Sequence, residues 1–151
     1  MLKKILSMFS SKNITYILTM LEAIEKVFYY TKDFEDEEEF YLADKQVYFN
    51  ATVNLLIAIG EENKKIDDSL KTSTLIKWKN ISAMRDKISH NYRGIDEFMV
   101  WSIIQEYLPK LKVALVEMLP KIEEHKIYIK EAISSQYYED LSYLSELLDA
   151  Y

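Results

Sequence analysis

Hydrophobic residues recur every three or four positions along most of the chain, which is the spacing of one face of an α-helix. The first such stretch predicts a helix from about Asn13 to Tyr30, with Asn13 as its N-terminal cap. A second helix is expected from about Glu37 to Lys64. Within it, residues 53–60, VNLLIAIG, are apolar nearly all round, as in the central helix of a bundle.

The same spacing continues in the second half of the chain. A third helix is expected from about Leu75 to Ser89, after which residues 90–94, HNYRG, can turn the chain. Asp96 is expected to cap a fourth helix, and Pro109 should kink this helix or start a new segment. A last amphipathic helix or pair covers 121–150. The pattern predicts an all-α fold, an antiparallel bundle of four to six helices in a single domain, 1–151.

Composition supports this reading and narrows the chemistry. The chain has two glycines and two prolines, residues that many-stranded β folds use freely, so long helices are favoured. It has no cysteine, which excludes disulfides, thiolate metal sites and cysteine nucleophiles, and which suits a cytoplasmic location. No apolar run approaches the length of a membrane span, so no membrane partner is expected.

Charge is distributed unevenly on a chain with a net charge of −6. Residues 33–44 hold seven acids and no base, and we expect a solvated helix start there rather than a metal site. Residues 71–93 hold six bases and one acid. Such a patch can select a phosphate ligand while the rest of the protein repels bulk polyanion. The alternative is a solvated helix face, which charge alone slightly favours.

The basic stretch also contains the candidate chemistry. Arg85, His90 and Tyr92 form an Arg-x4-His-x-Tyr arrangement, and the only other arginine, Arg93, follows directly. On an ideal helix, Arg85 and His90 would lie about 140° apart. They can therefore face one target only if the helix ends near His90. A capping histidine beside an interfacial tyrosine remains an equal alternative on spacing alone.

These residue types suit cleavage of RNA, in which the 2′-hydroxyl attacks its own phosphate and no metal or cofactor is needed. A histidine can exchange the proton near neutral pH, and an arginine can hold the phosphate through two donors. Lys79, Lys87 and Arg93 are further candidates for binding RNA phosphates. Acid and base are two roles, but each chain offers one suitable histidine. A two-fold dimer would bring two copies of His90 to one cleft.

At these residues the chain resembles the HepT-like branch of the HEPN superfamily, the toxin half of the HepT/MntA toxin–antitoxin pair. The resemblance covers roughly Asn13 to Ile122. It rests on three stretches in order, AIGEENKK, KWKNISAMRDKISHNY and GIDEFMVWSIIQEYLPKLK. It implies a HEPN-like core, 13–122, followed by a C-terminal helical extension, 123–151.

The resemblance also implies a function. It implies a dimeric, metal-independent endoribonuclease toxin of a type VII system, with its cleft between two copies of the third helix. Arg85 and His90 would inherit the catalytic roles. Tyr92 would shape the site and accept AMP from an MntA-like nucleotidyltransferase antitoxin, which silences the toxin.

Two departures from the family pattern bear on this expectation. Asp86 stands where the family usually has asparagine, and it could orient Arg85 or weaken RNA binding. The extension exceeds the usual length, and it could pack on the bundle, extend the dimer or face the partner. A second hypothesis is a non-catalytic helical module that partners a minimal nucleotidyltransferase. The intact Arg-x4-His motif favours the nuclease.

Overall fold

The structure is a computed structural model that describes residues 9–90 and 94–149. Tyr92 and Arg93 therefore lie outside the described residues. The elements that the described residues form are helical, and an isolated bridge between Phe9 and Ile122 belongs to no sheet. Within the same residues, no helix combines the length and apolar character needed to cross a membrane. The predicted all-α class is confirmed.

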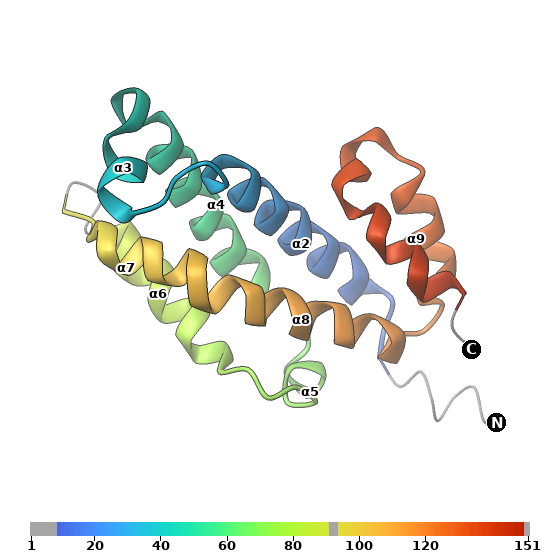
Figure 1. The fold of residues 1–151 in the computed structure, drawn as a ribbon. Helices are drawn as coiled ribbons and strands as arrows, with labels where there is room; N and C mark the ends of the chain where they lie inside the picture. The colour runs from blue at the N-terminus through green and yellow to red at the C-terminus, as the bar shows by residue number, and fades with distance from the viewer. Residues whose placement is uncertain (1–8, 91–93, 150–151) are drawn as a thin grey trace.

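Four long helical runs form the bundle, and consecutive runs point in alternating directions (Figure 1). The segments in chain order are α2 (Lys12–Thr31), α3 (Glu37–Leu42), η1 (Ala43–Gln46), α4 (Val47–Asn63), α5 (Asp68–Lys71), α6 (Trp78–His90), α7 (Glu97–Ser102), η2 (Ile103–Tyr107), α8 (Leu108–Met118), η3 (Leu119–Lys121), α9 (His125–Ile133) and η4 (Gln136–Leu148). Breaks divide several expected helices, so these segments outnumber the four to six expected.

The central pair of the bundle is α2 and α4, which pack along each other. The expected second helix, 37–64, is interrupted before α4 begins. Asp44, Lys45 and Gln46 all have positive φ angles, 46°, 54° and 69°, which stop α3 and restart the chain as α4. Hydrophobic spacing does not reveal this break, because Phe40 and Phe49 are buried on either side of it and their rings meet edge to face, with centroids 5.6 Å apart.

The predicted cap at Asn13 is wrong. The helix α2 begins at Lys12, and the Asn13 side chain is fully buried. Its amide oxygen accepts from the backbone N–H of Asp67 at 2.9 Å, and its amide nitrogen donates to Asp67 Oδ2 at 3.1 Å. A buried amide must satisfy both its donor and its acceptor, and here they tie the start of α2 to the loop before α5.

The fourth expected helix runs as α7, η2 and α8. Its predicted cap is confirmed, because Asp96 Oδ1 accepts from the backbone N–H of Phe98 at 2.9 Å. A new segment, α8, begins at Leu108 beside Pro109, as the sequence predicted. The preceding turn, η2, is a π-helical turn, and Pro109 lies in the first turn of α8, where its missing N–H breaks no hydrogen bond.

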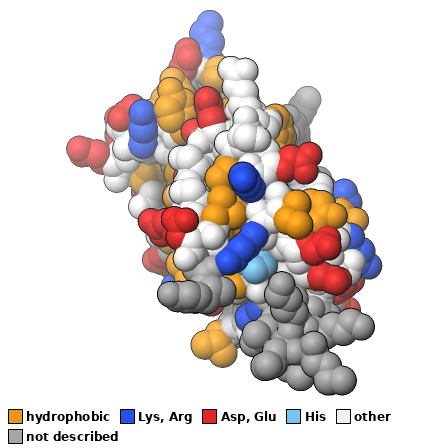
Figure 2. Space-filling model, turned by 90° about the vertical axis from the view of Figure 1, so that its right-hand side faces the viewer, with side chains coloured by type: hydrophobic (Ala, Val, Ile, Leu, Met, Phe, Trp, Pro, Cys, Tyr) orange, Lys and Arg blue, Asp and Glu red, His pale blue; other side chains and the backbone are white. Residues whose placement is uncertain are grey.

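The C-terminal extension packs on the bundle through α2 and η4. Leu141 and Leu144 of η4 are buried against the core, and Ile129 of α9 is buried beside them. Figure 2 shows the end of the molecule that carries this extension, where acidic and basic side chains are interspersed.

Candidate functional site

The helix α6 carries the site candidates that the structure describes. Its buried side chains, Ile81, Met84 and Ile88, fix which side faces the core. At about 100° per residue, Lys79, Lys87 and His90 lie within a sector about 80° wide. All three are exposed. The fold therefore brings two candidate phosphate-binding lysines and the candidate histidine to one open face, and His90 is the last described residue of α6.

Arg85 lies on a different side of α6, about 140° round the helix from His90, and it packs toward α4. Its side chain is 30% exposed, and its Nε lies 2.5 Å from Glu61 Oε1. The Nε–H is not directed at this oxygen, so the contact is an ion pair without an aligned hydrogen bond. On the other side, Arg85 Nη1 donates to Asp86 Oδ1 at 3.1 Å. Arg85 is thus held between two carboxylates.

Gly60 explains why α6 can approach α4 so closely at Arg85. A Cβ at Gly60 would collide with the Cβ of Arg85 and lie 2.8 Å from its Cγ. A glycine inside a helix costs about 1 kcal/mol relative to alanine, so its presence here needs a packing reason. The next residue, Glu61, then meets the guanidinium. Gly60 permits the approach, and Glu61 orients the arginine.

The two carboxylates restrict how Arg85 can bind a phosphate. A guanidinium offers two edges for bidentate binding, one formed by Nε and Nη2 and the other by Nη1 and Nη2. Glu61 occupies the first edge at Nε, and Asp86 occupies the second at Nη1. A phosphate can bind bidentately only after one carboxylate moves. Asp86 is the more exposed of the two, at 55% against 44%.

Sequence reasoning identified Arg85 but missed the residues of α4 and its C-terminal end that surround it. These are Gly60, which Arg85 packs against, Glu61, which pairs with it, and Lys64, which also pairs with Glu61. The ammonium of Lys64 lies 3.5 Å from the same Glu61 oxygen that contacts Arg85, so it shares the charge of that carboxylate. The sequence does carry a signal for Gly60 and Glu61. A glycine interrupts an otherwise apolar helix, and an acid follows it directly.

The candidates Tyr92 and Arg93 fall outside the described residues. The second histidine, His125, lies in the extension at the start of α9, where its Nδ1 is 3.1 Å from the backbone oxygen of Ile122. It belongs to a different element from His90. Of the sequence candidates, Arg85, His90, Lys79 and Lys87 are described, and all four lie on α6.

Comparisons with known proteins point to one family. Residues 20–118 match the family model described as "Ribonuclease HepT-like". The chain is 36% identical over 100 residues to the "Probable ribonuclease HepT" of Thermococcus cleftensis. The matched residues are 64% of this chain and 86% of that protein. The chain is also 30% identical over 109 residues to the "Putative RNase MJ1216" of Methanocaldococcus jannaschii, covering 72% and 88%. No solved structure matches the chain.

Proposed function

This chain belongs to the HepT-like ribonuclease family and is an endoribonuclease, and from that premise we propose that it is the toxin of a type VII toxin–antitoxin system. It cleaves RNA without a metal ion, by attack of the 2′-hydroxyl on the adjacent phosphate. One observation supports this proposal most strongly. The α6 helix combines an exposed His90, two exposed lysines and an arginine held against Glu61.

Each side chain has a role that follows from its chemistry. Arg85 offsets the charge that develops on the phosphate in the transition state. His90 moves the proton to or from the reacting oxygens. Lys79, Lys87 and Arg93 bind phosphates of the flanking strand, which gives affinity that falls as salt rises.

The active unit is a homodimer. Cleavage needs an acid and a base, and the other histidine of the chain, His125, lies in the extension on α9 rather than on α6. A two-fold axis beside the end of α6 would bring two copies of His90 to one cleft, with Arg85 from each copy on its flanks. The exposed position of His90 leaves it available for this arrangement.

The partner that controls the toxin is an MntA-like nucleotidyltransferase antitoxin, which transfers AMP to Tyr92. Tyr92 is two residues past His90 in the sequence. AMP on its phenol would bring a negative charge and a bulky group into the cleft where the substrate phosphate binds. It would compete with RNA by both charge and volume.

The test is cleavage of RNA by the purified protein in the presence of EDTA. We expect products with 2′,3′-cyclic phosphate ends, and we expect His90→Ala to abolish cleavage while the helical circular dichroism spectrum is unchanged. His125→Ala is the matched control and should keep full activity. Activity that disappears with EDTA and returns with magnesium would exclude the metal-independent mechanism.

A second candidate function is a non-catalytic helical module that binds a minimal nucleotidyltransferase. The observation that favours it is the pairing of Arg85 with two carboxylates, which leaves neither edge of the guanidinium free for a phosphate. If this function is correct, the protein binds its partner but cleaves no RNA, and removing the Asp86 charge by Asp86→Asn creates no cleavage.

A further inference from the structure

A small pocket lies between α6 and the run η2–α8, on the flank of α6 opposite to Arg85. Asn80 borders it on α6, about 140° round the helix from Arg85 and about 80° from His90. Its volume is about 290 Å³. Ligand pockets for drug-sized molecules start near 300 Å³, so this one suits a single small planar group.

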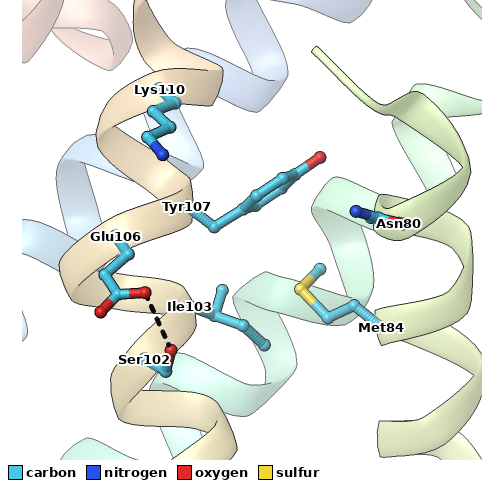
Figure 3. Close-up of a pocket in the computed structure, with 7 residues that line it drawn as sticks. All are labelled: Asn80, Met84, Ser102, Ile103, Glu106, Tyr107 and Lys110. Atoms are coloured by element: carbon cyan, nitrogen blue, oxygen red, sulfur yellow. Dashed lines mark hydrogen bonds between the residues drawn. The ribbon is translucent and has the colours of Figure 1, made fainter.

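The inner surface of the pocket is apolar, and a hydrogen bond holds its aromatic ring in place. Met84 is buried, and Ile103 faces it from η2, while the ring of Tyr107 extends across the pocket toward Asn80 (Figure 3). The Tyr107 hydroxyl donates to the backbone oxygen of Lys77 at 3.2 Å, which fixes the ring. Burial raises the pKa of Tyr107 to about 12, so the phenol keeps its proton and remains the donor to Lys77.

The rim of the pocket is polar and exposed. The hydroxyl of Ser102 donates to Glu106 Oε2 at 3.5 Å, and the Lys110 ammonium and the Asn80 amide complete the rim. An aromatic ring and a thioether suit the flat face of a nucleobase. An amide and a carboxylate can hydrogen-bond the edge of a base, and a lysine can hold the phosphate beside it.

The pocket is also positioned along a path from the proposed site. Lys87 lies within about 20° of Asn80 on the α6 surface and about 10 Å along its axis, while His90 lies about 15 Å along the axis. A strand with one phosphate at His90 can pass over Lys87, which would bind a second phosphate, and reach the pocket within a few nucleotides.

We propose that this pocket, formed by Asn80, Met84, Ile103 and Tyr107, binds one nucleobase of the RNA strand, a few nucleotides from the scissile phosphate. The Glu106 carboxylate accepts hydrogen bonds, so the pocket prefers bases with an exocyclic amino group, adenine, cytosine or guanine, over uracil. This inference rests on the proposed nuclease function, because it takes its ligand to be the substrate strand.

The experiment uses the full chain labelled with ¹³C at the methionine methyl groups and a 2′-O-methyl RNA oligonucleotide, which the proposed chemistry cannot cleave. We expect the Met84 methyl resonance to shift on titration. Asn80→Ala should weaken binding about three- to tenfold, the effect of losing one hydrogen bond. Oligo-adenylate should bind more tightly than oligo-uridylate, and Glu106→Gln should reduce that preference. Asn50→Ala, an exposed change on α4, should alter nothing.

Several results would overturn the proposal. An unchanged Met84 resonance, with Asn80→Ala binding as wild type, excludes a base in this pocket. A shift of equal size with AMP alone assigns the pocket to free nucleotides. A shift caused by dilution of the protein alone shows that a second copy covers the pocket. The proposed function fails separately. If unmodified RNA shifts Met84 but is not cleaved, the pocket stands and the nuclease mechanism does not.

Discussion

Two ion pairs join neighbouring helices of the bundle, and they differ in what surrounds them. Glu25 on α2 and Lys112 on α8 lie 2.6 Å apart with side chains 18% and 32% exposed, and the Tyr143 ring of the extension covers the ammonium at 4.5 Å. Glu61 and Arg85 are equally close, but Glu61 is 44% exposed, and a further carboxylate, Asp86, joins them.

The difference separates a pair covered within the fold from a pair that is open to solvent at the proposed site. The ammonium of Lys112 faces the Glu25 carboxylate and two aromatic rings, those of Phe28 and Tyr143. Its charge is therefore compensated by groups of the fold itself. The guanidinium of Arg85 keeps one nitrogen, Nη2, outside both carboxylate contacts, and its neighbours are exposed enough to move. Removing each cation should therefore have opposite consequences for activity and stability.

The largest effect is expected at the open pair. Arg85→Ala should lower kcat for RNA cleavage about 10²- to 10³-fold, as loss of one stabilising donor does in other active sites. The side chain is partly exposed, so the free energy of unfolding should change little. Single-turnover cleavage and urea unfolding measure the two quantities. Wild-type activity in this variant would remove Arg85 from the mechanism.

The reverse result is expected at the covered pair. Lys112→Ala leaves Glu25 with less compensation, and it should lower the free energy of unfolding by about 2 kcal/mol, below the value for a fully buried pair because Lys112 is about a third exposed. At a temperature where the variant is folded, kcat should be unchanged. A loss of activity larger than the loss of folded protein would break the distinction between the pairs.

The close approach of α4 and α6 can be tested at Gly60. Gly60→Ala improves helix propensity but forces a methyl group into the Arg85 side chain, and we expect a net destabilisation of about 1–2 kcal/mol together with reduced cleavage. Gly94→Ala is the matched control, because a Cβ there meets no atom of the described residues within 4 Å. A stabilised and fully active Gly60→Ala protein would mean that α6 shifts without affecting the site.

A smaller effect is expected from the second carboxylate of the open pair. Asp86→Asn removes the charge that competes with the substrate phosphate at Arg85 Nη1. We expect kcat/KM to rise about two- to tenfold at low salt and the gain to shrink as salt screens the charges. Glu131→Gln, an exposed change on α9, controls for net charge. A fall in kcat/KM would assign Asp86 the role of orienting Arg85.

The smallest effect concerns Tyr143, whose ring covers the pair of Glu25 and Lys112. Burial and the charge of Glu25 raise the pKa of Tyr143 far above its usual value. Above about pH 10 the unfolded chain loses this proton and the folded chain keeps it, so folding stability should fall as pH rises further. Tyr143→Phe should make the urea midpoint less sensitive to pH between about 9 and 11. An unchanged pH dependence would contradict this.

The sequence alone predicted those features that depend on residues near each other along the chain. Periodic apolar residues predicted the helices, and Asp96 was recognised as a cap because a cap acts on the next turn. The turn-forming stretch HNYRG, residues 90–94, predicted a third helix that ends near Ser89, and the described part of α6 reaches His90. These features follow from the repeat of one helix and need no knowledge of its neighbours.

The tertiary structure alone decided which side chains meet across helices. The carboxylate of Glu61 reaches Arg85 from 24 positions earlier in the sequence, Asn13 bonds Asp67 instead of capping, and three left-handed residues, 44–46, separate α3 from α4. Each depends on the register and distance at which two helices pack, and side-chain volumes throughout the core set that register. Periodicity along one helix carries no information about it, which is why the orienting partner of Arg85 emerged only from the fold.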